Sequence, residues 1–440
     1  MNQSKWDVVV VGGGLAGWIA AVYAAKNGKR TLLVEKAAVF GGRAATVIKE
    51  GTALNLGAHA VYRDGELPAV LKELGIELEG GVPEAGGYAN CNGKLYTLPG
   101  SPLSLLSSRL LSWPGKLEMA KLMMNVKAMN DSMLPAGSLA DWAEDSIREP
   151  MVRHLFYTLC RTATYAHRPD IQLAGPVLRQ LRHVLQGGVL YLHGGWQTMI
   201  ERLRLTAKGT GLVTAVTGRT VRRVSPAAAA ETRRYSVSFA DGDAVQAESV
   251  ILAIPPAECC RIVEGAERTS LDVWRRQAEP VTAACLDLVM RRLTQPRVQF
   301  VMGVDSPFLF TNQSRVATLN DNGLLAVSLL KYHGADQPHT EQDKRHMEHI
   351  MEQLQPGWRE ETAAVQHLPH MTVVHDHPHT GRQLLPGPAV PEMPGLYVAG
   401  DWAGHRELLA DASAASAKRA VGALLGQESK GGRNANRSAV

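Results

Sequence analysis

A glycine-rich turn near the N-terminus is the first stretch whose residue types could bind a ligand. Gly12, Gly14 and Gly17 follow a short β-branched run and open a helical pattern, Leu15–Lys26. In this setting the first glycine permits a tight turn and the second lets the backbone approach a pyrophosphate. The third lets the helix pack closely on the strand, with the anion at the helix N-terminus. The spacing predicts a dinucleotide site.

An acidic residue follows at the distance that such a site requires. Glu35 ends a second apolar strand, Thr31–Glu35, and Lys36 comes directly after it. A carboxylate at this position can accept hydrogen bonds from ribose hydroxyls and disfavours a 2′-phosphate. NADP is therefore the less favoured ligand, but the motif alone does not separate FAD from NAD.

A glycine pair with an arginine lies a few residues further on. Gly41, Gly42 and Arg43 form a loop from which a guanidinium can reach a diphosphate or a flavin edge with charge-assisted hydrogen bonds. This placement favours FAD.

The rest of the chain alternates between helical and strand patterns. Residues 88–186 are mostly helical in pattern, whereas residues 187–256 contain strands, a glycine pair, an amphipathic helix and a hairpin turned at Asp241 and Gly242. A strand, a loop and an Ala-rich helix follow Pro394. This order predicts an α/β fold whose cofactor domain is assembled from separated segments, with an α+β domain inserted between them.

Four segments carry a family resemblance. The stretch "VVVVGGGLAGWIAAVYAAKNGKRTLLVEKAAVFGGRAAT" resembles the opening of the phytoene desaturase, protoporphyrinogen oxidase and flavin amine oxidase superfamily, and most of all its phytoene desaturase-like members. The stretches "HGGWQTMIERL", "TVRRVSPAAAAETRRYSVSFADGDAVQAESVILAIPP" and "PGLYVAGDWAGHRELLADASAASAKRAV" match in the same order. The resemblance implies a Rossmann-type, glutathione reductase-like FAD domain. The Ser-Gly-Gly-Cys flavin tether is absent, so FAD is expected to be noncovalent.

The resemblance also implies roles for individual residues. Glu35 would hold the adenosine ribose, Arg43 would lie along the diphosphate or flavin, and the backbone at Val221 would meet the adenine. Asp401 would bond the ribityl-diphosphate portion, and a helix from about Ala412 would aim its N-terminus at the flavin pyrimidine. The expected FAD-contacting set is Gly12, Gly14, Leu15, Ala16, Gly17, Glu35, Lys36, Gly41, Gly42, Arg43, Gly57, Ala58, His59, Val221, Gly400, Asp401 and Ala412.

Histidines supply the remaining candidates for chemistry. His59, in "LNLGAH", falls where related flavoproteins bring the chain past the flavin, and could orient substrate or shuttle a proton. The alternative is a histidine satisfied by a backbone carbonyl. The run His367–His379 is interrupted by Pro378 and lacks a cysteine or glutamate ligand, so a solvated polar loop is expected there and no metal site.

Segment boundaries follow from these patterns. The expected order is FAD segment 1 at 1–88, a helical substrate or membrane-contact segment at 89–186, FAD segment 2 at 187–265, a substrate segment at 266–390, FAD segment 3 at 391–427, and a disordered tail at 428–440.

Composition restricts the partners. The net charge of +5 is small and dispersed, so no nucleic-acid partner is expected. Five cysteines without CxxC spacing indicate reduced thiols and a cytoplasmic location. The Leu- and Met-rich stretch from Leu98 to Met133 suits an apolar substrate tunnel or peripheral membrane contact; the alternative is an ordinary helical core.

Three functions stay open. The first is an FAD-dependent desaturase or dehydrogenase that removes a hydride equivalent from an apolar small molecule such as an isoprenoid. The second is an amine or amino acid oxidase, disfavoured because Cys285 or Leu286 stands where amine-oxidising relatives carry a lysine, and because no second aromatic follows Trp402. The third is a noncatalytic prenyl-binding escort, which would have eroded cofactor motifs. The electron acceptor stays unassigned.

Overall fold

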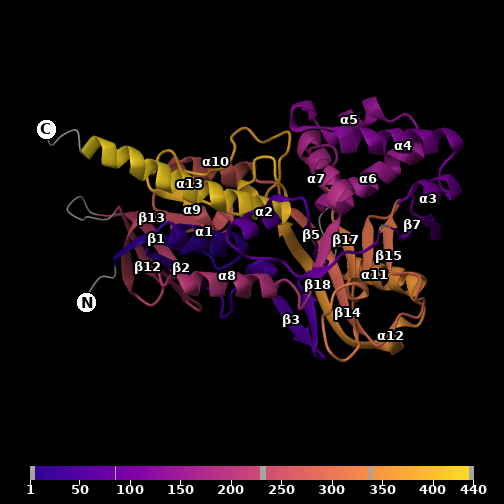
Figure 1. Ribbon diagram of the computed structural model, residues 1–440, viewed down its shortest axis with the longest axis horizontal. Helices are drawn as coiled ribbons and strands as arrows, with labels where there is room; N and C mark the ends of the chain where they lie inside the picture. Colours follow the sequence, from indigo (N-terminus) through magenta and orange to yellow (C-terminus); the bar gives the residue numbers. More distant parts are fainter. Residues whose placement is uncertain (1–4, 85, 228–233, 336–339, 436–440) are drawn as a thin grey trace.

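Two seven-stranded sheets and a group of helices form most of the described part of the molecule, and two smaller sheets, of two and three strands, accompany them (Figure 1). The computed structural model describes residues 5–84, 86–227, 234–335 and 340–435, with only the backbone given over 427–435. No helix within these ranges is long and apolar enough to cross a membrane.

The first sheet is the Rossmann-type sheet. Its strand order is β10-β2-β1-β13-β12-β11, with β19 beside β13. The five strands β10, β2, β1, β13 and β19 run parallel, and β12 and β11 are antiparallel additions. The strands are β1 (Lys5–Val11), β2 (Thr31–Val34), β10 (Val213–Val216), β11 (Val221–Pro226), β12 (Tyr235–Phe239), β13 (Ala244–Leu252) and β19 (Leu396–Val398). Early, middle and late parts of the chain thus build one sheet, which confirms the predicted discontinuous fold.

Helices cover both faces of this sheet. One face carries α1 (Leu15–Lys26), α2 (Glu66–Glu73), α8 (Gln197–Thr210) and α13 (Leu409–Ala435). The other face carries α9 (Pro256–Ile262) and α10 (Ser270–Gln277). Helix α1 is apolar nearly all round because it lies between the sheet and the helices α8 and α13.

The second sheet belongs to the other half of the molecule. Its order is β18-β14-β17-β16-β15-β7-β8. The strands are β7 (Tyr88–Cys91), β8 (Lys94–Thr97), β14 (Val281–Met290), β15 (Phe300–Gly303), β16 (Phe308–Asn312), β17 (Leu325–Tyr332) and β18 (Thr362–Val374). One face packs on α11 (Thr340–Leu354) and α12 (Trp358–Glu361).

The helical group covers the opposite face of the second sheet (Figure 1). It consists of α3 (Pro102–Ser107), α4 (Trp113–Ala128), α5 (Leu139–Ser146), α6 (Pro150–Thr164) and α7 (Ala174–Gly187). Five short strands connect the two halves: β3 (Thr46–Lys49), β4 (Thr52–Asn55), β5 (Val61–Tyr62), β6 (Gly80–Gly81) and β9 (Val189–Leu192).

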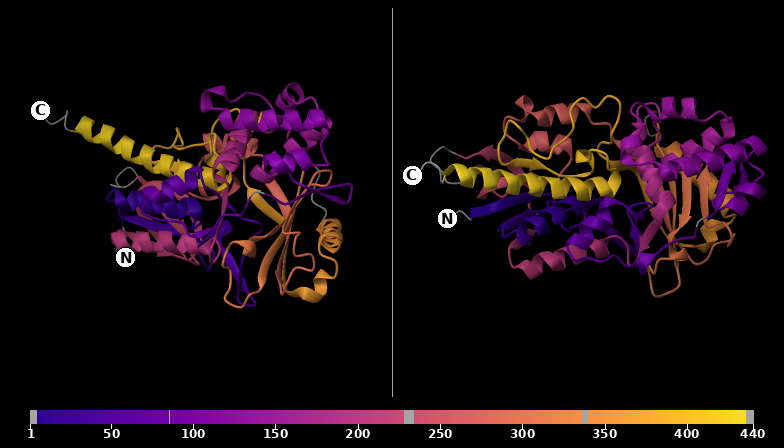
Figure 2. Two further views of the ribbon diagram at one scale, coloured as in Figure 1. Left: turned by 45° about the vertical axis from the view of Figure 1, so that its right-hand side comes forward. Right: turned by 45° about the horizontal axis from the view of Figure 1, so that its top comes forward.

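The structure differs from the expected elements in three places. The predicted helical stretch begins with a hairpin, in which β7 and β8 are joined by a turn at Asn92 and Gly93, whose φ values are 50° and 72°. The tail expected to be disordered from 428 continues α13 as far as Ala435, and residues 436–440 lie outside the described part. Both views of Figure 2 show this helix projecting past the first sheet. The helix also begins at Leu409, three residues before the expected start. The segment boundaries themselves stay predictions.

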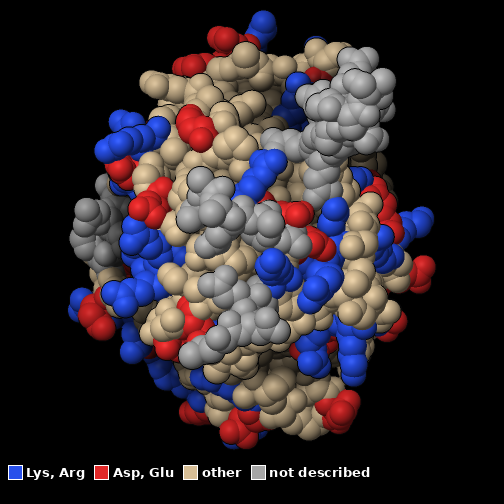
Figure 3. Space-filling model, turned by 90° about the vertical axis from the view of Figure 1, so that its left-hand side faces the viewer, with Lys and Arg blue, Asp and Glu red and all other residues tan. Residues whose placement is uncertain are grey.

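The face at the Rossmann-type end carries charges of both signs. Lys and Arg side chains are interspersed with Asp and Glu there (Figure 3), as the dispersed basic residues of the sequence suggest.

Candidate active site

The glycine-rich turn has the geometry that the motif predicts. Gly12 has a φ of 108°, a conformation that favours glycine, and a Cβ placed on Gly17 would overlap the Gly12 carbonyl oxygen. No side chain caps the N-terminus of α1, whose N-cap is Gly14. A Cβ on Gly14 would meet only the carbonyl oxygen of Gly41, at 3.8 Å. The first-turn N–H groups of α1 therefore face open space that can hold an anion.

That open space belongs to a cavity of about 700 Å³, the larger of two described below. It runs from the carboxyl ends of the first sheet toward β18, and segments within residues 11–67, 165–262 and 368–413 line it. The predicted residues on its wall are Gly12, Gly14, Leu15, Ala16, Glu35, Lys36, Gly41, Gly42, Arg43, Ala58, His59, Val221, Gly400 and Asp401. Gly17, Gly57 and Ala412 do not line the cavity.

Glu35 is fixed at the edge of the cavity by the backbone. Its Oε2 accepts from the Gly13 N–H at 2.7 Å, and its Oε1 accepts from the Ala37 N–H at 2.8 Å. Each carboxylate oxygen keeps a further lone pair. Glu35 thus both shapes the glycine turn and presents acceptors to the cavity.

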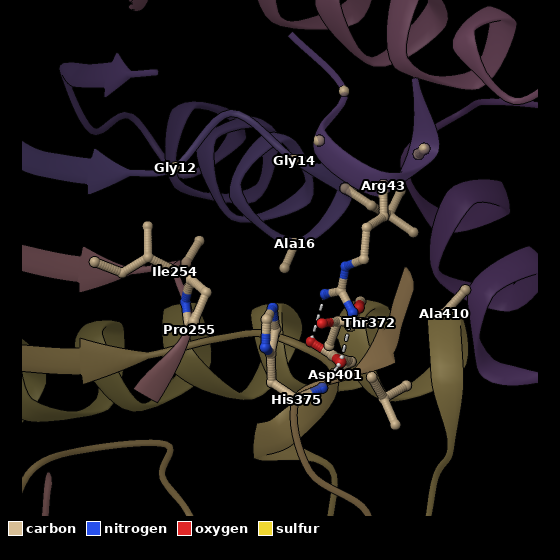
Figure 4. A pocket seen from close by; sticks show the side chains of 18 of the residues that line it. Gly12, Gly14, Ala16, Arg43, Ile254, Pro255, Thr372, His375, Asp401 and Ala410 are labelled. Atoms are coloured by element: carbon tan, nitrogen blue, oxygen red, sulfur yellow. Dashed lines mark hydrogen bonds and ion pairs between the residues drawn. The ribbon is translucent and has the colours of Figure 1, made fainter. Parts of the chain in front are cut away.

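Arg43 and Asp401 form the only described ion pair between two of the predicted site residues. Nη1 and Nη2 of Arg43 donate to the two carboxylate oxygens at 2.9 and 2.7 Å, and Nη1 also donates to the Val373 carbonyl at 2.7 Å. The His375 N–H donates to the same carboxylate at 2.7 Å. Figure 4 shows the guanidinium extending across the cavity to Asp401. Both were expected to contact FAD directly, and the structure places them against each other.

The electrostatics of this pair are reciprocal. Burial alone would raise the pKa of Asp401, but the charge and hydrogen bonds of Arg43, together with His375, outweigh it and hold that pKa below its usual range. Burial would likewise lower the pKa of Arg43, and the Asp401 carboxylate outweighs it, so the pKa is raised. The Arg43 side chain is 40% exposed, toward the cavity that it lines. Both groups are charged at neutral pH.

His59 lies half-buried on the cavity wall. Its Nδ1 is 2.9 Å from the Gly57 carbonyl oxygen, and its ring meets Trp196 edge-on with centroids 4.8 Å apart. Burial lowers the pKa of His59, and the Arg43 charge adds to this; the backbone carbonyls of Gly57 and Arg43 act in the opposite direction. The neutral ring has one N–H for two carbonyls, whereas the protonated ring could serve both.

Three wall residues gave no signal in the sequence. Tyr165 and Leu409 have φ values of 62° and 57°, which bulky residues rarely adopt. Such outliers concentrate at functional sites. The Tyr165 hydroxyl donates to the Ala58 carbonyl. Asp411, in the first turn of α13, is the third.

Asp411 is a buried acid at one corner of the cavity. It is 4% exposed, and its Oδ1 accepts from the Leu67 N–H at 2.8 Å, at the start of α2. Burial raises its pKa to about 7, while the Leu67 N–H acts in the opposite direction. Asp411 therefore exchanges a proton near neutral pH.

The histidine run is not the solvated loop expected from its composition. Its first part is strand β18, His375 lines the cavity, and His377 and His379 are only 6% and 4% exposed. The Nδ1 of His377 lies 3.0 Å from the Glu279 carbonyl oxygen. The high histidine content of this run predicts contact with water. In the structure, however, residues from distant segments pack around these rings and bury them. Within the described ranges, no group of His, Cys, Asp or Glu side chains could hold a metal ion.

The cavity fits a flavin dinucleotide. It offers uncapped helix N–H groups for a pyrophosphate, a fixed carboxylate for a ribose, and a glycine at position 400 with a φ of 149° where the chain can approach closely. Its wall continues into an apolar region beyond Arg43. These groups are donors and acceptors of the types that FAD requires.

Comparison with known proteins identifies the family. Residues 15–425 match the model of flavin-containing amine oxidoreductases. The chain belongs to this family, and it is an FAD-dependent oxidoreductase. FAD is its cofactor, as the glycine turn and Arg43 predicted.

Individual relatives are more distant. An oxidoreductase from Methanosarcina mazei is 19% identical with a TM-score of 0.74, over 94% of this chain and 99% of that one. Cyclohexylamine oxidase from Brevibacterium oxydans is 15% identical with a TM-score of 0.68, over 97% and 100%. Both likenesses show the shared fold. Thiamine thiazole synthase of Sulfolobus acidocaldarius is 42% identical over 79 residues, which span 18% of this chain and only 27% of that curated relative.

Proposed function

We propose that the chain is an FAD-dependent dehydrogenase of the desaturase type, which removes a hydride equivalent from a carbon of an apolar small molecule. The observation that carries this proposal is the apolar wall at the second-sheet end of the cavity. Its side chains come from the turn after β4, from β18 and from the start of α13: Leu56, Ala58, Leu368, Met371, Val373 and Leu409.

The charges around the cavity support the same substrate class. Glu258 pairs with Arg261 at 2.5 Å, Asp401 pairs with Arg43, and Glu35 is bonded to backbone N–H groups. These acids already have partners, so they offer little to a substrate cation. Cys285, one of the two positions compared with the lysine of amine-oxidising relatives, is fully buried against Asp287 and does not line the cavity.

The residues that line the main cavity would have different roles in this reaction. FAD supplies the hydride acceptor when bound. The α1 N-terminus, Glu35 and Gly400 would hold it, while Arg43 is kept in place by Asp401. The apolar wall would exclude water and align the substrate, and neutral His59 would take up a proton.

Amine oxidation is the second candidate, and one observation favours it. Asp411 lines the cavity and has no cation within ion-pairing distance among the described residues. A substrate ammonium could pair with this carboxylate once it has lost its proton. Family membership supports both candidates.

Anaerobic mixing separates them. The FAD-loaded protein is mixed with polyenes and, separately, with primary amines, and loss of the visible flavin absorption is followed. We expect polyenes or related apolar compounds to bleach the flavin. Bleaching by amines alone would overturn the desaturase proposal in favour of the second candidate.

We also infer that the surface of α3 and α4 contacts a lipid bilayer from which an apolar substrate is taken. Leu103, Trp113, Leu117 and Met124 are between 64% and 79% exposed. Three lysines also lie on α4, and the Nζ of Lys116 lies 4.5 Å from the Trp113 ring centre. Glu118, the acid of α4, instead accepts from the N–H groups of residues 148 and 149. Exposed apolar side chains beside lysines suit an anionic membrane surface.

Vesicle binding tests this contact. We expect the protein to sediment with phosphatidylglycerol vesicles and less with phosphatidylcholine vesicles. The double variant Trp113→Ser with Leu117→Ser should lose this binding. Leu205→Ser is the matched control, since Leu205 is 62% exposed on α8. Equal binding by both variants and the unmodified chain would exclude this surface.

A further inference from the structure

A second cavity lies within the helical group. Its volume is about 370 Å³, within the range of small-molecule sites, and none of its lining residues lines the first cavity. Apolar side chains from the start of α5, from the loop after α6 and from the turn after β15 form part of its wall: Leu139, Ala166, Pro169 and Val304. The other lining residues are His154, Tyr157, Cys160, Arg161, His167, Gln172 and Asp305. The family's cofactor motifs contribute nothing to it.

One buried cation lines this cavity without a described carboxylate in ion-pairing distance. Arg161, on α6, is 5% exposed. Its Nη2 donates to the Gly303 carbonyl at 2.6 Å, and its Nη1 lies 3.4 Å from the Nδ1 of His167. Its Nε has no partner in the described chain, and the Tyr332 ring centre is 5.5 Å from the guanidinium carbon. No described carboxylate lies within ion-pairing distance of Arg161.

Arg382 shows how this protein otherwise handles a buried arginine. Its side chain is 2% exposed and pairs with Asp376 at 2.5 Å. A buried charge without a partner is costly, which is why such groups are normally paired. Burial lowers the pKa of Arg161, and no carboxylate opposes this effect. The missing negative charge would have to come from outside the chain.

The neighbours of Arg161 restrict what that charge can be. Burial and then the Arg161 charge lower the pKa of His167 to about 4, so His167 is neutral and adds no second cation. Asp305 also lines the cavity, is exposed, and accepts from the Asn92 N–H at 3.0 Å. One cation beside one anion disfavours a multiply charged ligand such as phosphate. The four apolar side chains of the wall can pack against an apolar ligand body, and the neutral polar groups of Tyr157 and Gln172 add no charge.

We propose that this second cavity is a binding site for a small apolar monocarboxylate, whose carboxylate pairs with Arg161. The site goes beyond the proposed oxidoreductase function, and it stands whichever substrate the flavin oxidises. The planar guanidinium suits a carboxylate because it can donate more than one hydrogen bond to it.

Calorimetry with butyrate tests the proposal. FAD-loaded protein is titrated with butyrate in a buffer free of carboxylates and phosphate, and with butyramide as the neutral isostere. We expect saturable butyrate binding at one site per chain, with butyramide at least about tenfold weaker because it lacks the charge. Equal affinity for both compounds, or no butyrate binding, would overturn the proposal.

Charge changes at Asp305 locate the site without disturbing the core. Asp305→Asn removes an exposed like charge and should strengthen butyrate binding about threefold, and Asp305→Lys should strengthen it further. Asp321→Asn is the matched control, since Asp321 is exposed and does not line the cavity. If the Asp305 and Asp321 variants behave alike, butyrate binds elsewhere.

Arg161→Gln removes the proposed partner itself. We expect it to abolish butyrate binding while retaining its FAD content. A folded variant that binds butyrate as the unmodified chain does would contradict the assignment. Should the variant not fold, the Asp305 series decides the question, because Asp305 is exposed.

Discussion

Arg43 and Asp401 are 358 positions apart in the chain, and their side chains form a two-point ion pair inside the main cavity. Arg43 comes from the loop after the second strand, and Asp401 from the turn after the last strand. The pair therefore joins the first and last parts of the FAD-binding region at the point where the cofactor site closes.

Asp401→Asn should destabilise the protein by about 2 kcal/mol. The change leaves the Arg43 charge without its partner, but Arg43 is 40% exposed, so the loss is smaller than the roughly 3–5 kcal/mol for a fully buried pair. Thermal or urea unfolding of the apoprotein measures it. Asp170→Asn is the control, because Asp170 pairs with Arg168 on the surface and should cost under about 1 kcal/mol. Equal losses of unfolding free energy in the two variants would show that the Arg43–Asp401 pair stabilises the protein no more than a surface ion pair does.

Glu35 serves the backbone and the cavity, and two substitutions separate these roles. Glu35→Gln keeps an oxygen for one of the two N–H groups, whereas Glu35→Ala loses both bonds. We expect FAD affinity to fall by at least about tenfold in Glu35→Ala, because losing charge-assisted hydrogen bonds from the ribose hydroxyls to the carboxylate costs more than the roughly 1.4 kcal/mol of a tenfold change. The FAD affinity of Glu35→Gln should lie between those of Glu35→Ala and the unmodified chain. Recovery of flavin fluorescence on dissociation measures both, and an unchanged affinity in Glu35→Ala would argue against a ribose-binding role.

Asp411 should make stability depend on pH. Its pKa is about 7 in the folded protein and near 3.8 in the unfolded chain, so the folded state binds the proton more tightly. The resulting stability is fully present below the unfolded pKa and is lost as pH rises to about 7. Asp411→Asn should remove this pH dependence. The free energy of unfolding of the variant should therefore exceed that of the unmodified chain by a margin that grows between pH 4 and pH 8, at about 1.4 kcal/mol per unit of pKa shift. Urea unfolding at several pH values checks the slope. If the free energies of unfolding of the variant and the unmodified chain change with pH in parallel, Asp411 stays charged in the folded protein over this pH range.

His59→Phe tests proton handling at the cavity wall. Phenylalanine can keep the edge-on contact with Trp196 but loses both ring nitrogens. If His59 moves a proton in the reaction, kcat/KM should fall by about a hundredfold while FAD content is retained. We expect this outcome once a substrate is found. A fall of less than about threefold, together with a lower melting temperature, would instead indicate a structural histidine.

Gly17→Ala should be strongly destabilising because the new methyl group would overlap the Gly12 carbonyl oxygen, which cannot move without opening the turn. Gly209→Ala, in α8, is the matched control: it has nothing within 4 Å and should stabilise the protein by about 0.5–1 kcal/mol. Melting temperatures report both changes. An unchanged melting temperature in Gly17→Ala would show that α1 and β1 can move apart without destabilising the protein.

The sequence predicted those parts of the site in which backbone conformation and chemistry are local. Gly12, Gly14 and Glu35 belong to one continuous βαβ unit, and their spacing alone indicates their positions. Tyr165, Leu409 and Asp411 could not be found in this way. Their presence on the cavity wall depends on how the helical group, β18 and α13 pack together, and no local pattern encodes a contact such as that between Asp411 and Leu67.

The same reasoning explains the histidine run. Composition predicts solvation, yet the Glu279 carbonyl, almost a hundred residues away, serves His377, and Asp401 serves the backbone of His375. Long-range hydrogen bonds of this kind override the local preference for water.

The position of β19 in the first sheet has a consequence for biosynthesis. The strand Leu396–Val398 and the turn containing Asp401 leave the ribosome only after all the other strands of that sheet. Until then a nascent chain exposes the Arg43 guanidinium and one edge of β13 without their partners. The Asp401 side of the main cavity is thus completed late in synthesis, only after β18 and β19 have been translated.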